Sequence, residues 1–374
     1  MRTPDRTDTS LFGRWWWTVD RFSLGAVGLL IVIGAILVIA GSPAVAQKIG
    51  VESYYFVKRQ TFFLLMSAAV IVFMSLLDTA AVRRVGALGF VVSFLLLASV
   101  PFLGAEIKGS VRWVSLLGIT VQPSEFIKPC FALFNAWLLV RRVLEPGFPG
   151  MKLSFGLYAV VMALLLSQPD LGMALTFTAI WSAQLFLAGI PYLFVAVIGG
   201  GTVALGVGAY FTFAHVKSRI DRFLSPEAGE NYQVEKALEA FASGGVFGKG
   251  PGEGVVKRAI PDSHTDFIFA VAGEEFGMIF CIFILLLFAV IVLRSLTRMS
   301  HDPDLYVMIA AGGLVTQFGL QAAVNMGVAL HLLPTKGMTL PFLSYGGSSM
   351  LAFGIGVGAL LALTRKKYGY GLRL

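Results

Sequence analysis

Long apolar runs, separated by short polar turns, repeat along the whole chain. Most of these runs are close to the roughly 20 helical residues that cross a hydrocarbon layer of about 30 Å. The pattern therefore predicts an all-α integral membrane protein with ten transmembrane helices. The fifth and sixth runs are short and are separated only by Gln168-Pro169-Asp170, so one broken helix is the alternative there. The runs are 22–42, 54–77, 85–104, 123–141, 153–167, 170–188, 191–213, 267–294, 306–330 and 343–364.

The turns between the runs set the expected topology. Fifteen of the 29 Lys and Arg residues fall on the side that carries both termini, and seven of the other fourteen lie in the long segment 214–266. Cytoplasmic turns are enriched in Lys and Arg, and long loops count little in this rule. We therefore expect a cytoplasmic segment at 1–21, a membrane domain at 22–364 with an extracytoplasmic loop at 214–266 between helices seven and eight, and a cytoplasmic tail at 365–374.

Composition agrees with a membrane protein, because 57% of the residues are hydrophobic and only 13% are charged. Soluble domains average about half apolar and a quarter charged. The net charge of +8 does not indicate a nucleic-acid partner, since the cytoplasmic bias already accounts for about half of the basic residues. Ala44-Val45-Ala46 resembles a signal-peptidase site, but the preceding run is longer than the usual h-region of about 7–15 residues.

The clearest candidate chemistry lies where the eighth run begins. Asp262, His264 and Asp266 come together there. Counting about twenty residues outward from Arg294 at 1.5 Å each places Glu274 near the hydrocarbon edge and Asp266 at headgroup level. The sugars and diphosphate of a lipid-linked substrate would lie at that depth. Capping of the helix amino terminus is the alternative role for the two aspartates.

Two further places in the apolar runs carry ionisable residues, which are functional candidates by default in a membrane. Glu125 and Lys128 are three residues apart, a spacing that predicts an ion pair on one helical face; a purely structural salt bridge is the alternative. Asp170 follows Gln168 at the Pro-made break. It is expected either to cap a helix or to line a cavity.

Glycine-rich and polar stretches supply further candidates. The tract 243–254 lacks a nucleotide-binding spacing, so it is interpreted as a flexible connector or as a source of backbone amides for an anion. The polar stretch 333–349, which contains Lys336, is predicted to form part of the site wall. Residues 234–241 predict a short amphipathic helix. Ala270, Gly273 and Gly277 predict either a groove or close helix packing.

Seven blocks, in order, resemble the SEDS family of membrane proteins and extend over most of the chain. One departure is Ile260-Pro261-Asp262, where that family usually has Leu-Pro-Glu. Residues 273–277 and 344–349 are more similar to the cell-division branch of the family than to its elongation branch. The blocks are 109–113, 122–128, 168–172, 231–233, 243–250, 264–269 and 341–349.

The resemblance implies a ten-helix peptidoglycan glycosyltransferase of the inner membrane that uses lipid II, with Asp266 as the catalytic carboxylate on the periplasmic face. It implies septal wall synthesis and release of undecaprenyl diphosphate. The expected partners are lipid II, a class B penicillin-binding protein of the FtsI type, division regulators of the FtsQ, FtsL, FtsB and FtsN type, and membrane lipids.

We assign the surrounding roles as hypotheses. Arg112 and Lys128 would stabilise the leaving diphosphate, with Glu125 orienting Lys128. Trp113 would stack on a sugar. A divalent cation, Mg²⁺ or Mn²⁺, could share the diphosphate with Asp266, although the sequence shows no complete set of metal ligands. The remaining predicted substrate-binding residues are His264, Asp262, Ser344 and Ser348, and the remaining cavity or structural residues are Asp170, Gln168, Lys336 and Glu274.

Two other functions remain open from the sequence. A flippase would move lipid II without making bonds, although the carboxylates cluster at one face and transporter sites lie near the midplane. A non-catalytic scaffold of the division machinery would leave Asp266 as a replaceable cap. Within the enzymatic interpretation, an elongation role is the alternative to division.

Overall fold

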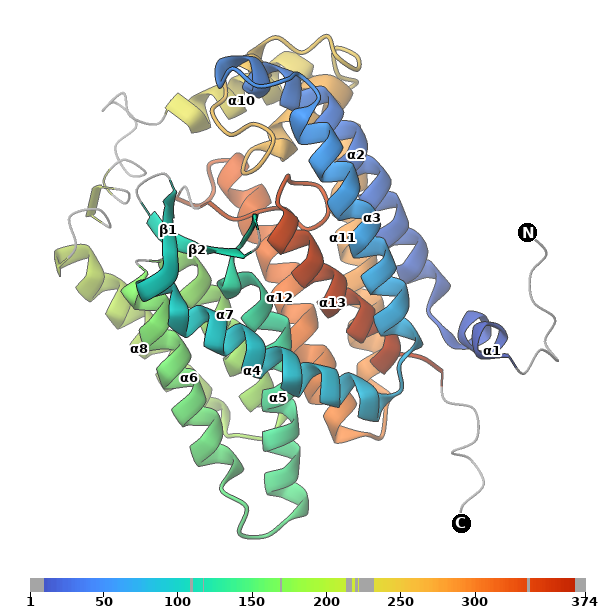
Figure 1. Cartoon of the computed structure of the whole chain (residues 1–374), viewed down its shortest axis with the longest axis vertical. Coiled ribbons are helices and arrows are strands. Elements are labelled where there is room, and N and C mark those ends of the chain that lie inside the picture. The colour runs from blue at the N-terminus through green and yellow to red at the C-terminus, as the bar shows by residue number, and fades with distance from the viewer. Residues whose placement is uncertain are drawn as a thin grey trace.

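The computed structural model describes residues 10–107, 110–116, 118–168, 170–212, 217–218, 221, 232–334 and 337–366. Each of the ten predicted runs corresponds to a helix, α2 to α8 and α11 to α13 (Figure 1). The helices are α1 Leu11–Thr18, α2 Arg21–Lys48, α3 Tyr55–Leu76, α4 Thr79–Leu103, α5 Pro123–Leu144, α6 Gly150–Ser167, α7 Leu171–Leu187, α8 Tyr192–Thr212, α10 Tyr232–Gly244, α11 Ile268–Ser300, α12 Leu305–Ala329 and α13 Gly347–Leu363.

Six of these helices, α2, α3, α4, α6, α11 and α12, contain stretches long and apolar enough to cross a membrane. The chain is thus a membrane protein with several spans. Helices α7 and α13 are apolar but shorter, so ten crossings stay a prediction. α6 and α7 are separate helices on either side of Gln168 and Asp170, which excludes the single broken helix.

The two ends of the bundle differ in what they carry. At one end, here called the terminal end, the Lys366 N–H donates to the Thr18 carbonyl at 3.0 Å, so the described beginning and end of the chain meet there. The opposite end, here called the loop end, carries residues 104–107, 110–116, 118–121, 232–267 and 337–346, with α10 above α11 (Figure 1). The alternation of helices between these two ends follows the predicted topology.

A small antiparallel sheet at the loop end corrects the all-α prediction. Strands β1 Gly104–Ile107, β2 Ser110–Leu116 and β3 Ile119–Val121 pair in the order β1-β2-β3. β-branched and aromatic residues such as Val111, Trp113 and Val114 favour strands, and Gly118 supplies a positive φ of 81° for the turn. The polar residues of this segment favour a loop, but its β-branched and aromatic residues outweigh them.

Two clusters of buried apolar side chains fill the bundle. One joins α2, α10, α11, α12 and α13, and the other joins α4, α5, α6, α7, α12 and α13. α12 and α13 contribute to both and therefore form the centre. α2 runs without a break through residues 44–46 and buries Leu30 and Leu37 completely, so cleavage after residue 46 would remove part of the core.

The structure of α10 and α11 tests the expected amphipathic helix and the expected role of the small residues in α11. α10 confirms the predicted short amphipathic helix and extends it to Tyr232–Gly244. Gly277 breaks the helical geometry of α11 with φ 81° and ψ −179°. A Cβ on Gly273 would lie 2.2 Å from the Phe241 ring, and one on Gly277 would lie 2.4 Å from the Val246 carbonyl oxygen. The small residues serve close packing, and the groove interpretation is wrong.

Candidate active site at the loop end

The turn before α11 holds Asp266 in place through bonds from three segments. The Asp266 N–H donates to the Asp262 carbonyl at 3.1 Å, and Asp262 adopts a positive φ of 54°. From α12, the Asn325 amide donates to the Asp266 carbonyl at 2.9 Å. From the segment before α13, the Ser344 hydroxyl donates to the Thr265 carbonyl at 2.5 Å. The backbone at position 266 is therefore fixed by contacts far apart in the sequence.

The Asp266 side chain is half-buried and lies against the backbone of Gly337. A Cβ added to Gly337 would be 3.4 Å from Asp266 Oδ2, an ordinary contact distance, so the carboxylate lies beside this glycine. Phe267, and not Asp266, is the N-cap residue of α11. Helix capping therefore does not explain the carboxylate at 266.

His264 lies inside the protein beside this turn. Its ring centroid is 4.6 Å from that of Phe56 and 5.4 Å from that of Tyr345, and only 5% of the residue is exposed. The His264 carbonyl accepts from the Tyr345 N–H at 2.8 Å. These contacts make His264 a packed aromatic that anchors α3 and the segment before α13 to the turn; its predicted role in substrate binding stays a prediction.

Lys128 and Glu125 form the predicted ion pair at the start of α5, with Lys128 Nζ 2.9 Å from Glu125 Oε2. Lys128 has no exposed surface. Its Nζ also donates to Gln321 Oε1 at 2.8 Å and contacts Met173 Sδ at 3.3 Å. The ammonium is fully enclosed by protein groups, which the spacing of the two residues could not reveal.

Arg112 on β2 reaches the junction of α6 and α7. Its guanidinium lies 3.3 Å from Asp170 Oδ2 and donates to the Gln168 carbonyl at 3.2 Å. Asp170 Oδ1 caps α7 by accepting from the Met173 N–H at 3.2 Å, which confirms the capping interpretation. Trp113, next to Arg112, is half-buried on the opposite face of the strand. The structure therefore brings Arg112 close to Asp170, although the two are 58 residues apart in the chain.

Two amides on α12 that the sequence reading missed connect these groups to Asp266. Gln321 binds Lys128 and also donates to the Thr339 carbonyl at 3.3 Å. Asn325, one turn further, donates to the carbonyls of Asp266 and Met338 at 2.9 and 2.6 Å. Gln317, Gln321 and Asn325 recur every four residues in an otherwise apolar helix. That polar stripe was the signal in the sequence.

The two predicted serines near α13 bond to the backbone. Ser344 Oγ accepts from the Leu340 N–H at 2.8 Å, and Ser348 Oγ accepts from the Gln122 N–H at 3.0 Å. Ser348 thus ties the start of α13 to the start of α5. Both hydroxyls shape the site wall, and direct substrate contact by either one stays a prediction. Lys336 lies outside the described residues.

Glu274 has a structural role in the described chain. Its carboxylate accepts from the N–H groups of Val255, Val256 and Lys257, each at 2.7 Å. The glycine tract runs alongside: the Gly250 N–H donates to the Glu275 carbonyl at 2.9 Å. The tract supplies partners for backbone groups that the break at Gly277 would leave free. The tract is held by defined hydrogen bonds, which corrects its interpretation as a flexible connector.

Within the described residues, no group of three or more His, Cys, Asp or Glu side chains is arranged to hold a metal ion. Asp266 and Asp262 lie on one turn and could provide two carboxylates. A cation there would need its other ligands from a substrate diphosphate or water, so the predicted divalent cation stays a prediction.

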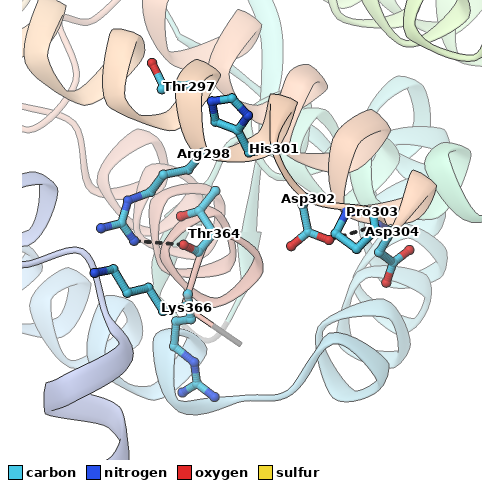
Figure 2. Close-up of a pocket in the computed structure, with 9 residues that line it drawn as sticks. Thr297, Arg298, His301, Asp302, Pro303, Asp304, Thr364 and Lys366 are labelled. Atoms are coloured by element: carbon cyan, nitrogen blue, oxygen red, sulfur yellow. Dashed lines mark hydrogen bonds between the residues drawn. The ribbon is translucent and has the colours of Figure 1, made fainter. Parts of the chain in front are cut away.

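A separate hollow of about 600 Å³ opens at the terminal end, remote from Asp266. Figure 2 shows that Arg298 and Lys366 lie on one side of it and Asp302 and Asp304 on the other. Arg298 donates to the Thr364 carbonyl at 3.0 Å, and Asp302 Oδ1 accepts from the Asp304 N–H at 2.9 Å. None of the residues predicted for catalysis or binding lines this hollow.

Comparison with known proteins identifies the family of the chain. The family model for FtsW, RodA and SpoVE, described as "Cell cycle protein", matches residues 21–369. A probable peptidoglycan glycosyltransferase FtsW of Caulobacter vibrioides is 43% identical over 98% of this chain and 94% of its own length. A protein of the same description from Trichlorobacter lovleyi is 37% identical over 92% of this chain and 93% of its own.

Two solved structures have the same fold. One chain belongs to a structure described as the structural coordination of polymerization and crosslinking by a peptidoglycan synthase complex; it is 27% identical, with a TM-score of 0.75, and the match covers 93% of this chain and 98% of that one. The rod shape determining protein RodA of Thermus thermophilus is 27% identical, with a TM-score of 0.68, and the match covers 95% and 99% of the two chains.

Proposed function

The chain belongs to the FtsW/RodA/SpoVE family of cell cycle proteins, and on this premise we propose that it is a peptidoglycan glycosyltransferase that polymerises lipid II during septal wall synthesis in cell division. The observation that carries the proposal is the 43% identity, over 98% of the chain, to a relative named for that activity. The half-buried carboxylate of Asp266 at the loop end supplies the chemistry that such a reaction needs.

Asp266 acts as the general base in this proposal. A hydroxyl of one N-acetylglucosamine attacks the anomeric carbon of an N-acetylmuramic acid on another glycan. The new glycosidic C–O bond forms as the bond to the diphosphate breaks, with inversion, and the hydroxyl proton passes to the Asp266 carboxylate. The electron pair leaves with undecaprenyl diphosphate. The bonds from Asn325 and Ser344 to the turn keep the carboxylate in one position, as general-base catalysis requires.

The cations around the site have different tasks. About 21% of the Arg112 side chain is exposed, against 1% for Lys128. Arg112 is therefore the group that meets the diphosphate, while Lys128 is a positioning residue that holds α5, α7 and α12 together. If Mg²⁺ or Mn²⁺ takes part, Asp266 would help to hold it, and the ion would supply positive charge for the leaving diphosphate.

Orientation and partners follow from the charge pattern and the relatives. The excess of Lys and Arg at the terminal end supports a cytoplasmic position for that end and a periplasmic one for Asp266. The partner of this synthase is a class B penicillin-binding protein, a proposal supported by the similarity to a chain of a peptidoglycan synthase complex. Division regulators of the FtsQ, FtsL, FtsB and FtsN type complete the assembly at the septum.

The test is polymerisation of purified lipid II in detergent, with the cognate transpeptidase present. Asp266→Asn should lower the rate by about 10²–10⁴, the usual contribution of a general base, without changing thermal unfolding. Glu52→Gln is the matched control, because Glu52 is an exposed carboxylate at the same end, paired only with Lys58 in the described structure. Equal rates for wild type and Asp266→Asn would refute the catalytic role. A wild type that makes no polymer but translocates lipid II across the membrane of proteoliposomes would establish the flippase.

A further inference from the structure

The hollow of about 600 Å³ at the terminal end takes no part in the proposed reaction. It lies between the end of α11, the turn into α12 and the end of α13. Its volume is within the range of about 300–1,000 Å³ that is usual for small-ligand sites. Arg298 and Lys366 lie on one side of it, and Asp302 and Asp304 lie on the other (Figure 2). Charged side chains therefore border a space that is large enough for a polar ligand.

The cations of the hollow have too few carboxylates. Arg298 lies 3.2 Å from Asp20, but Asp20 also pairs with Arg294. Arg365 donates to two backbone carbonyls at the end of α3, which carry no full charge. The Lys366 side chain is exposed and forms no ion pair in the described part of the chain. An ammonium and a guanidinium at the hollow are thus left without a neutralising carboxylate.

The two carboxylates of the hollow already have other partners. Asp302 Oδ1 accepts from the Asp304 N–H, and Asp304 Oδ1 accepts from the Tyr306 N–H, both at 2.9 Å. Asp304 is the N-cap residue of α12, where the positive end of the helix dipole compensates a carboxylate. The uncompensated charge of the hollow is therefore positive. Such a site favours an anion that accepts several hydrogen bonds, as a phosphate group does.

The hollow lies at the depth of lipid headgroups and beside a surface of α11 that faces outward. Thr297, which lines the hollow, is three residues beyond Arg294, about 4.5 Å along the helix. A headgroup layer is roughly 5–8 Å thick. Leu286, Val290 and Leu293 precede Thr297 on the same helical face and are 55%, 38% and 61% exposed. Acyl chains that lie along this apolar face would end at the mouth of the hollow.

We propose that the hollow binds the headgroup of an anionic phospholipid, such as phosphatidylglycerol, from the leaflet at the terminal end. The phosphate contacts Arg298 and Lys366, and the acyl chains lie along the exposed face of α11. With the terminal end in the cytoplasm, as proposed above, this is the side on which basic pockets of membrane proteins bind anionic headgroups. Phosphatidylethanolamine and phosphatidylcholine add a cation to the headgroup, which the same side chains repel.

The first experiment compares headgroups on the intact protein. The protein is purified in detergent, equilibrated with equimolar phosphatidylglycerol, phosphatidylethanolamine and phosphatidylcholine of identical acyl chains, and examined by native mass spectrometry. One additional net negative charge beside the cations should give about a fivefold preference for phosphatidylglycerol. Equal retention of the three lipids, a preference for either zwitterionic lipid, or retention of none would overturn the proposal.

A second arm distinguishes a lipid from a soluble phosphate. Glycerol 3-phosphate carries a similar anionic group but has no acyl chain for the exposed face of α11. An excess of it should leave the bound phosphatidylglycerol in place. Displacement of the lipid would assign the hollow to a soluble ligand and overturn the proposal.

Variants then locate the bound lipid. Lys366→Gln keeps the backbone N–H that bonds to Thr18 and should reduce the preference to about onefold, because one cation near the membrane surface contributes about that much. Arg84→Gln is the matched control, since Arg84 is exposed near the start of α4, at the same end, but does not line the hollow. Its preference should stay near fivefold. An unchanged preference in Lys366→Gln, or equal losses in both variants, would show general attraction to the basic end and refute the site.

Discussion

Three carboxylates at the terminal end cap helices, whereas the Glu125–Lys128 ion pair at the loop end caps none. Asp20, Asp78 and Asp304 cap α2, α4 and α12 by accepting backbone N–H groups. At the loop end, Lys128 and Glu125 are enclosed within the bundle, with 0% and 3% exposed. Caps stabilise the helices they start. A buried pair costs desolvation that its attraction barely offsets.

The difference indicates where the chain gives up stability for function. An apolar pair of similar volume in place of Glu125 and Lys128 would often be as stable or more so. Their presence is therefore better explained by the site they support, since Gln321 connects Lys128 to the segment that faces Asp266. The terminal end needs no such explanation, because its three carboxylates satisfy helix ends and the buried one, Asp20, also pairs with Arg294 and Arg298. The following predictions test this contrast, from the largest expected effect on polymerisation to the smallest.

The largest effect after Asp266 is expected at Lys128. Lys128→Met leaves Glu125 buried without its partner and should lower the free energy of unfolding by about 3–5 kcal/mol. Polymerisation should fall by about 10², because α5 and α12 shift around the site. The double variant Lys128→Met with Glu125→Gln removes both charges. It should regain most of the lost stability in detergent unfolding while polymerisation stays low.

That double variant decides between the functional and the purely structural salt bridge. If the double variant recovers both stability and polymerisation, the pair serves only the fold. If stability returns alone, the ammonium itself is needed for a productive site. Glycan length on gels and thermal unfolding of the same preparations supply the two measurements.

Asn325 is expected to act as a positioning residue with a smaller effect. Asn325→Leu removes the donor to the Asp266 and Met338 carbonyls and should cost about 1–3 kcal/mol of stability. Because the base loses its fixed position, kcat should fall about tenfold with KM for lipid II nearly unchanged. Gln317→Leu on the same face is the control, since neither polar atom of Gln317 has a partner in the described structure. A matching loss of kcat in the control would contradict the role of Asn325.

Variants of Arg112 and of Asp170 should show whether Arg112 recognises the diphosphate or only packs against Asp170. Their partly exposed ion pair is worth about 0–1 kcal/mol, so neither variant should unfold the protein. Arg112→Gln should raise KM for lipid II about fivefold through loss of the cation. Asp170→Asn keeps an oxygen for capping α7 and leaves Arg112 charged, so its KM should stay near wild type. Equal increases in both variants would show that the pair is only structural.

Much of the helical fold could be predicted from the sequence, and the small sheet could not. Apolar runs such as 54–77 and 306–330 end within two residues of α3 and α12, because bilayer thickness sets the length of an apolar helix. The segment 104–121 is short, polar and rich in turn residues, and pairing of its strands depends on contacts that no local pattern specifies. The break at Gly277 could not be predicted for the same reason, since it depends on the packing of the glycine tract against α11.

Several residues of the candidate site could be predicted from the sequence, but the hydrogen bonds that join them across the fold could not. Ion-pair spacing gave Glu125 and Lys128, and the Pro break gave Asp170 as a cap. The bond from Asn325 to Asp266 joins residues 59 apart, and the one from Lys128 to Gln321 joins residues 193 apart. Such pairings follow from the packing order of the helices, which hydropathy does not specify.

Asp20 at the terminal end should affect stability and leave polymerisation unchanged. Burial alone would raise the pKa of Asp20, but hydrogen bonds from Arg294 and Ser23 and the charge of Arg298 outweigh it and lower the pKa. A carboxyl with a lowered pKa in the folded state stabilises above its unfolded pKa of about 3.9, and this contribution is lost as pH falls through the folded value. Wild type should thus unfold at a higher temperature than Asp20→Asn at pH 7, and the gap should begin to narrow as pH falls below about 4. A gap that does not narrow as pH falls below about 4, or a loss of polymerisation in Asp20→Asn at pH 7, would contradict the contrast between the two ends.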